Sequence, residues 1–314
     1  MILLLLASAL GLLALPGCAR PLGRRLPPAE WAKLCAGLLL AGGVALEAGL
    51  VVVGGPTALR LAGMKAVADL CEHLLGALAP GGTPLGMAAA MTALLLAVAA
   101  GRSLVRARHS RRVLRVEPGL GWHGEWCGHD LVVLPSEELV AFSAGGRPPQ
   151  VVVSQRLVDI LADHELAAVL RHELAHVHHR HERYLLLARV VEQSLWLLPF
   201  VRRSTGTLRC ALERWADEEA AGGARRGRES VRAALVRVIE ATATPDVAAF
   251  VSVGTVVERL QALQAAPASG LSLLRRFVVY VPALVLVLLA VAALEGTVEH
   301  VAMLRVFAGL CPPH

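Results

Sequence analysis

The sequence predicts an α+β domain attached to a bundle of about four membrane-spanning helices. Hydrophobic residues make up 55% of the 314-residue chain and the mean hydropathy is +0.58, which are values typical of a membrane protein. The apolar runs gather towards the two ends of the chain, whereas the middle mixes short strand-like segments with helix-forming ones. We therefore expect a membrane part over residues 1–101, a folded domain over 102–275, and a last helix with a short tail over 276–314.

Four apolar runs are candidates for the membrane spans. They cover residues 2–16, 34–53, 84–101 and 277–294, against roughly 20 residues needed to cross a bilayer. The first run is short enough to be the apolar part of a signal peptide, but no basic residue precedes it. Basic residues follow it instead, which favours an uncleaved span.

The basic residues of the short loops predict the orientation in the membrane. The loop after the first run holds four of them, Arg20, Arg24, Arg25 and Lys33, whereas the next loop holds only Arg60 and Lys65. We therefore expect the first loop inside, the domain over 102–275 in the cytoplasm and both termini outside. Six arginines over residues 102–115 also allow a nucleic-acid interpretation. Their position after an apolar span favours the lipid bilayer as the partner, and no nucleic acid is expected.

Within the middle domain, four short segments have the composition of strands: residues 113–116, 131–134, 139–143 and 150–153. Helix formers dominate from residue 163 onward and again over 208–221, where Gly222 and Gly223 predict the helix end. Later helices are expected over residues 229–243 and 255–266. The apolar run over 184–201 is expected to be a helix that packs on the domain or lies at the membrane surface.

The most specific motif of the chain is His172-Glu173-Leu174-Ala175-His176. Histidines four apart on a helix point the same way, so that one metal ion can bind both. Glu173 can accept a proton from a water molecule that the metal makes acidic, which is the chemistry of a zinc hydrolase with one Zn²⁺ per chain. Three further histidines follow directly, at positions 178, 179 and 181, and we interpret them as a solvated helix end.

A third metal ligand must come from another segment, and the best source is the pair Glu213 and Asp217. They lie four apart on one helix face, so one carboxylate can bind the metal while the other hydrogen-bonds a ligand histidine. We favour Glu213 as the ligand. A second group of metal-binding residue types, His123, Cys127 and His129, lacks a standard zinc spacing and is expected to be an ordinary surface loop.

His172-Glu173-x-x-His176 together with Glu213-x-x-x-Asp217, preceded by residues 149–154 and 165–171, resembles the integral-membrane gluzincin peptidases. One branch of these contains the BlaR/MecR-type antirepressor peptidases, and another contains the HtpX-like and CAAX prenyl proteases. The HtpX-like group usually has a transmembrane hairpin between the second histidine and the third ligand. Only 36 residues separate His176 from Glu213 here. This interval is too short for two spans and their connections, which favours the BlaR/MecR-type branch.

The resemblance implies a zincin-like (gluzincin) α+β peptidase domain, with zinc ligands at His172, His176 and Glu213, Glu173 as the base and Asp217 in support. In this class an exposed strand pairs with the extended substrate, and residues 139–143 are the candidate, with Leu139, Ala141 and Ser143 on one face. The expected partner is a protein or peptide substrate, with a cytoplasmic transcriptional repressor as the specific candidate. No penicillin-binding domain follows the last apolar run, so beta-lactam sensing is not implied.

Three functions therefore stay open. The first is a zinc endopeptidase that cleaves a regulatory protein in a signalling pathway, and the second is an HtpX-like protease for quality control of membrane proteins. The third belongs to another class, a non-catalytic signal transducer that keeps zinc for structure. A structural site needs no general base, so the presence of Glu173 favours an enzyme.

Overall fold

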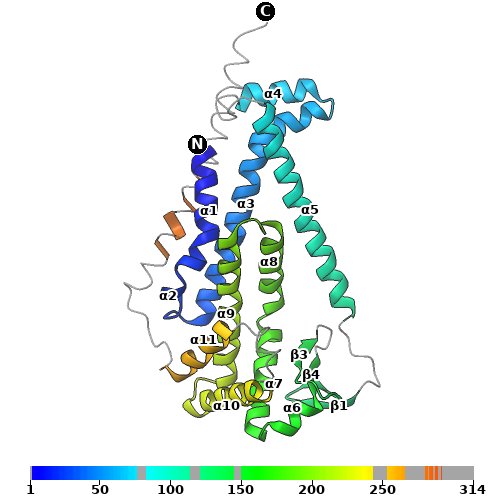
Figure 1. Ribbon diagram of the computed structural model, residues 1–314, viewed down its shortest axis with the longest axis vertical. Coiled ribbons are helices and arrows are strands. Elements are labelled where there is room, and N and C mark those ends of the chain that lie inside the picture. The colour runs from blue at the N-terminus through cyan, green and yellow to red at the C-terminus, as the bar shows by residue number, and fades with distance from the viewer. Residues whose placement is uncertain are drawn as a thin grey trace, which may run out of the picture.

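The computed structural model describes residues 2–75, 83–113, 121–144, 150–242 and 253–265, with scattered positions between 280 and 291. The molecule is elongated, with a bundle of long helices at one end and a smaller mixed part of helices and a sheet at the other (Figure 1). The amino-terminus and the α3–α5 connection lie at the far end of the bundle. The connection between α1 and α3 lies at the end that faces the mixed part.

The bundle consists of α1 (Ile2–Cys18), α3 (Pro28–Leu61) and α5 (Thr83–Val113), with short helices α2 (Arg20–Gly23) and α4 (Lys65–Leu75) in the connections. Two stretches, Pro28–Leu61 and Pro84–Ala107, are long and apolar enough to cross a membrane. Only 28% and 17% of their most apolar windows is buried inside the protein. Because water disfavours so much exposed apolar surface, these two helices indicate a membrane protein.

The expectation of about four spans is therefore too high for the part of the chain that the structure describes. The apolar helix α1 has 17 residues, which at 1.5 Å per residue gives about 26 Å, less than the roughly 30 Å of a hydrocarbon core. It packs against α3 and α9 and belongs to the same bundle. The run expected over residues 277–294 lies largely outside the described residues.

The sheet has four strands in the order β1-β2-β4-β3. β1 (Trp122–Trp126) and β2 (His129–Leu134) are antiparallel, β2 and β4 (Gln150–Ser154) are parallel, and β3 (Ala141–Ala144) is antiparallel to β4. The strands expected over 131–134, 139–143 and 150–153 correspond to β2, β3 and β4. The strand expected at residue 113 is wrong, because Val113 continues the arginine-rich end of α5, and residues 114–116 lie outside the described part.

The segment with His123, Cys127 and His129 is a β-hairpin and not a loop. Cys127 and Gly128 form its two-residue turn, with φ values of 49° and 76°. Positive φ at both turn residues is the geometry that matches the twist of paired strands. Among the described residues, the three side chains of this segment form no group that could hold a metal ion.

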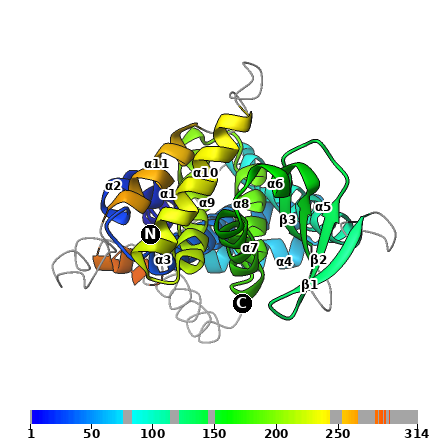
Figure 2. The same ribbon diagram turned by 90° about the horizontal axis from the view of Figure 1, so that it is seen from below.

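Helices α6 (Gln155–Ile160), α7 (Asp163–His178), α10 (Arg225–Thr242) and α11 (Val253–Gln264) complete the mixed part. Valines of β4 pack against leucines of α6 and α7 and against Ala234 of α10, which gives this end a core of its own. The sheet lies on one side of α7, while α9, α10 and α11 lie on the other (Figure 2). Helix α7 is therefore held at the centre of the mixed part.

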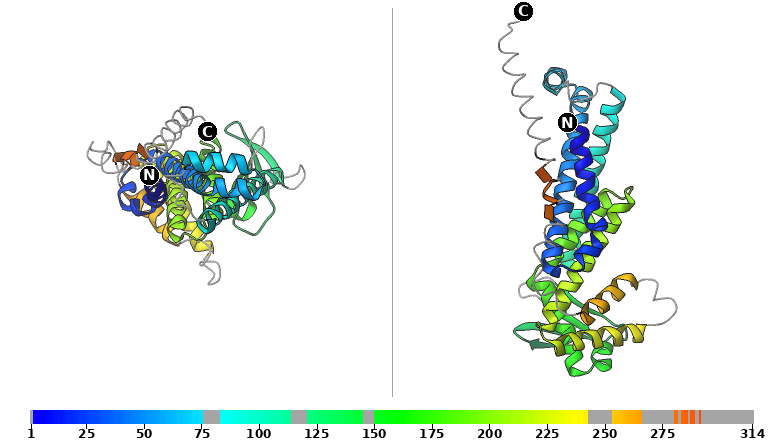
Figure 3. Two further views of the ribbon diagram at one scale, coloured as in Figure 1. Left: turned by 90° about the horizontal axis from the view of Figure 1, so that it is seen from above. Right: turned by 90° about the vertical axis from the view of Figure 1, so that its left-hand side faces the viewer.

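The apolar run over 184–201 is not one helix, as we expected, but the tip of a hairpin. Helix α8 (His181–Ser194) ends before a turn at residues 195–198, and α9 (Pro199–Ala221) returns antiparallel to it. The hairpin stands beside α1, α3 and α5 (Figure 3) and shares one apolar core with α1 and α3. Trp196 and Leu197 at its tip are 62% and 72% exposed. The membrane helices and α9 are thus one packed unit.

Candidate metal centre

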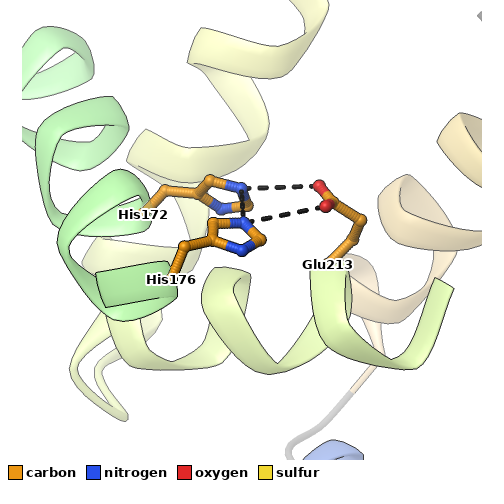
Figure 4. A group of neighbouring side chains, drawn as sticks. All are labelled: His172, His176 and Glu213. Atoms are coloured by element: carbon orange, nitrogen blue, oxygen red, sulfur yellow. Dashed lines mark hydrogen bonds and ion pairs between the residues drawn. The ribbon is translucent and has the colours of Figure 1, made fainter. Parts of the chain in front are cut away.

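Three side chains from two helices meet at one point between α7 and α9 (Figure 4). The Nε2 atoms of His172 and His176 lie 3.2 Å apart. The Glu213 carboxylate closes the triangle, with Oε2 3.5 Å from His172 Nε2 and Oε1 3.6 Å from His176 Nε2. The side chains are 12%, 14% and 30% exposed, so the site is open to solvent on one side.

The geometry fits a tetrahedral zinc ion. Ligand atoms about 2.0–2.1 Å from such an ion lie about 3.3 Å from one another. The three distances between donor atoms are close to that value, and the donor set of two imidazoles and one carboxylate is typical of a catalytic site with one open position.

Helix α7 places the two histidines because its start is well defined. The Glu165 carboxylate accepts a hydrogen bond from the backbone N–H of Ala162 at 2.9 Å, which caps the helix. Arg237 of α10 pairs with the same carboxylate at 2.9 Å. From this fixed start, His172 and His176 follow on the helix face that points at α9.

Helix α9 presents Glu213 and Asp217 one turn apart, and its end at Gly222, with φ 59°, agrees with the expected glycine stop. Asp217 is 2% exposed, and its Oδ1 lies 3.0 Å from Nδ1 of His172. The two atoms are within hydrogen-bond distance, although the ring is not aligned for a full hydrogen bond. The structure thus brings together all four residues proposed for the metal centre, together with Glu173.

Arg259 of α11 is a site residue that no motif in the sequence indicated. It donates to both oxygens of Asp217, at 2.8 and 2.7 Å, and lies 3.1 Å from Glu213 Oε2. Its cation holds the pKa of Asp217 well below the usual range against the effect of burial. The arginine therefore compensates the buried Asp217 and the partly exposed Glu213 at the edge of the metal centre.

A second ion-pair group ties α11 to the connection between α1 and α3. Glu258, next to Arg259, accepts hydrogen bonds from Arg20 and Arg24 at 2.6 and 2.9 Å. Arg214, next to Glu213, donates to the backbone oxygen of Arg24 at 2.9 Å. The α1–α3 connection therefore contacts the neighbours of two site residues, and it lies on the same side of the membrane helices as the metal centre.

His181 is the second site residue that sequence reasoning missed. The histidines after the motif were expected to be a solvated helix end, and His178 is indeed exposed. His181, by contrast, is fully buried and contacts the ring of the ligand His176. It follows Arg180, which takes the left-handed conformation with φ 52° at the junction between α7 and α8.

Residues 108–211 match the model of peptidase family M48. The matched part runs from the end of α5 into α9, covers about a third of the chain and contains both histidine ligands. Together with the three metal-binding side chains, this match shows that the protein is a zinc metallopeptidase, with a catalytic part similar to family M48. Its zinc ligands are His172, His176 and Glu213, the last of which lies two residues beyond the match. No curated protein sequence and no solved structure matches the chain.

Electrostatics at the peptidase centre predict that zinc binding releases a proton. Burial opposes the charged form of His172, but Asp217 and Glu213 outweigh it and raise the pKa of His172 to about 10 in the metal-free site. Burial lowers the pKa of His176 to about 4. At pH 7 only His172 carries the proton that zinc must displace, so the zinc affinity should rise about tenfold per pH unit between pH 6 and 8.

Calorimetric titration in buffers of different ionisation enthalpy measures this release, with about one proton expected at pH 7. Asp217→Asn removes the main partner that raises the pKa of His172. This variant should therefore release fewer protons when it binds zinc. In the metal-free protein the same shift stabilises the fold below pH about 6.5, and this contribution is lost as the pH rises towards 10. Zinc binding that is independent of pH over this range would contradict the assignment.

Replacing Arg259 is expected to destabilise the metal-free peptidase more than the zinc-loaded form. Without the guanidinium, the protonated His172 is the one cation left beside the charges of Asp217 and Glu213 among the described site residues, and breaking a buried ion pair such as Arg259–Asp217 costs about 3–5 kcal/mol. Zinc supplies positive charge to the same carboxylates, so the loss should be smaller when it is bound. Denaturant unfolding of Arg259→Met in detergent, with and without zinc, measures both values. Arg225→Met, at a 93% exposed arginine, is the control; an equal loss in both metal states would refute this account.

Proposed function

We propose that this peptidase is a membrane-anchored endopeptidase that cleaves extended segments of proteins at the membrane surface. The observation that carries the proposal is the open edge of β3 beside Glu173. The backbone of Ser143 in β3 hydrogen-bonds the Glu173 carboxylate, so the end of the sheet meets the metal helix directly. A substrate strand that added to this edge would run past the metal centre.

The register of β3 determines which of its main-chain groups face the open edge. Val140 accepts a hydrogen bond from Ser154 at 2.9 Å, so its backbone points towards β4. Successive residues of a strand alternate, and Ala141 and Ser143 therefore direct their N–H and C=O groups away from β4. No other described strand pairs with this edge. The side chains of Leu139 and Ala141 pack on the core beneath the sheet, which leaves the backbone for the substrate.

Each residue near the metal then has a distinct role. A zinc ion held by His172, His176 and Glu213 would polarise the scissile carbonyl and make a water molecule acidic. Burial raises the pKa of Glu173, which suits a group that accepts a proton from that water and passes it to the leaving amine. Asp217 holds His172 in orientation, and Arg259 holds Asp217.

The edge is tested by Ala141→Pro, which removes one outward N–H without removing a bond to β4. Proline is tolerated at an edge strand when its nitrogen faces away from the sheet. The loss of one main-chain hydrogen bond to the substrate should lower kcat/KM for a dye-quenched unfolded protein by about 3- to 10-fold. Zinc content should be unchanged. Ala141→Ser keeps the N–H and is the control; if the proline variant cleaves as fast as the control, β3 is not the substrate edge.

The position of the α8–α9 hairpin bears on the substrate. The interval between His176 and Glu213 was expected to be too short for a transmembrane hairpin, and this was the reason to favour the BlaR/MecR-type branch. A helical hairpin does form there and packs on α1 and α3, but neither of its helices is among the two described ones that are long and apolar enough to span a membrane. Together with the family match, the arrangement favours HtpX-like cleavage of membrane proteins. A cytoplasmic transcriptional repressor as the substrate stays a prediction.

Comparison of cells that carry the wild type with cells that carry Glu173→Gln distinguishes the two substrates. Quality control predicts that many membrane proteins with unfolded segments accumulate in the variant. A signalling role predicts that one regulatory protein accumulates and that the expression of its target genes changes.

We also propose that the catalytic end faces the cytoplasm, as the arginine-rich connections indicate. A reporter enzyme that is active only when exported tests this orientation. Fused after Gly222, it must stay inactive.

A further inference from the structure

We infer that His181 is a positioning residue of the zinc site, which holds the ligand His176 through an imidazole–imidazole hydrogen bond. The Nδ1 atoms of the two rings lie 3.0 Å apart, and the ring planes are nearly perpendicular at 89°. This inference rests on the zinc site and not on the choice of substrate.

The direction of the hydrogen bond follows from the zinc geometry. His176 turns Nε2 towards His172 and Glu213, so this nitrogen must offer its lone pair to the metal. A neutral imidazole that binds metal through one nitrogen carries its proton on the other. His176 therefore donates from Nδ1, and His181 accepts at Nδ1 and carries its own proton on Nε2.

The surroundings of His181 hold its ring in this orientation. The side chain is fully buried, and its ring packs on Trp215 of α9 with 4.8 Å between centroids. The ring of Tyr184 lies on another side of His181, with 6.4 Å between the ring centroids. The Nε2 atom of His181 is buried without a hydrogen-bond partner. A buried polar group left unpaired is costly, and it is the other ring nitrogen, Nδ1, that has a polar partner in the ligand His176.

The two ligand histidines are thus supported in different ways. Asp217 faces Nδ1 of His172 with a carboxylate, whereas His181 faces Nδ1 of His176 with a neutral ring. Such partners fix the ring and its proton, and their loss typically lowers metal affinity 10- to 100-fold. A neutral acceptor orients His176 without adding a further negative charge beside Glu213.

The test compares variants that keep or remove the acceptor at one position. His181→Phe preserves a buried ring but has no acceptor, whereas His181→Asn places a carbonyl oxygen close to where Nδ1 lies. We expect His181→Phe to bind zinc about 10- to 100-fold more weakly in competition with a chelator. His181→Asn should stay within about threefold of the wild type. His178→Phe, at the exposed histidine of the same segment, is the control.

The absorption spectrum of the Co²⁺-substituted protein reports on ligand geometry without proteolysis, so failure of this inference is distinguishable from failure of the proposed function. This spectrum should change in His181→Phe and should be the same as that of the wild type in His181→Asn. If the phenylalanine variant does not fold, His181→Gln replaces it, because its longer side chain cannot place the oxygen at the Nδ1 position. Equal zinc affinity and equal spectra in the variants with and without the acceptor would overturn the inference.

Discussion

Glu173→Gln is expected to lower proteolytic kcat/KM about a thousandfold while the protein keeps its zinc. The substitution preserves the size of the side chain but removes the group that accepts and returns a proton, and general acid–base catalysis typically contributes between about a hundredfold and ten-thousandfold. Glu173 is not one of the three groups that surround the metal position, so the ligand set is intact. Cleavage of a dye-quenched unfolded protein and zinc analysis of the same samples measure both parts.

Glu219→Gln is the matched control, because its side chain is 52% exposed and it carries the same chemical change on the opposite helix of the site. The control should cleave like the wild type. Two results would count against the catalytic role of Glu173. One is a variant that cleaves at the wild-type rate. The other is a variant that loses zinc together with activity, since the loss would then be one of metal and not of a base. A protein that keeps zinc and never cleaves would instead support a non-catalytic transducer.

His176→Ala and Glu213→Ala are expected to weaken zinc binding by more than about a hundredfold, which is the upper end of the effect of losing a partner of a ligand. Each removes one corner of a triangle with sides of 3.2 to 3.6 Å. With two protein ligands left, the ion is held by fewer donors than any catalytic zinc site of this kind uses.

Chelator competition on the purified proteins measures this loss, again with Glu219→Gln as the control. Both variants should fold, because the ligand side chains are partly exposed and the core of the domain lies under the sheet. Circular dichroism of the metal-free proteins checks this point. Wild-type zinc affinity in Glu213→Ala would show that the third ligand comes from another residue.

The parts of the site that could be predicted are those that depend on local spacing. His172 and His176, and likewise Glu213 and Asp217, lie four apart in segments rich in helix formers, and helix periodicity alone puts each pair on one face. A catalytic zinc site needs a third protein ligand, and this requirement predicts that the two pairs lie close together. The strands at 131–134 and 150–153 were found for a similar reason, since runs of valine and leucine between turn residues indicate buried strands.

The missed features depend on contacts between distant segments or on single backbone torsions. Arg259 lies 42 residues after Asp217 and looks like an ordinary helix arginine. The buried His181 follows Arg180, and the left-handed conformation of Arg180 is one that an arginine at that position does not predict. The α8–α9 hairpin did have a signal that was available in the sequence. Pro199 follows a leucine run, and a proline at this point ends one helix and begins the next.

Zinc K-edge X-ray absorption on the purified wild-type protein tests the central claim most directly. A zinc site formed by His172, His176 and Glu213 predicts two imidazole ligands and oxygen ligands at about 2.0–2.2 Å, with no sulfur. In His176→Ala the outer-shell signal of one imidazole should disappear from whatever zinc remains bound. A zinc–sulfur distance of about 2.3 Å, or an unchanged count of imidazoles in that variant, would contradict the account.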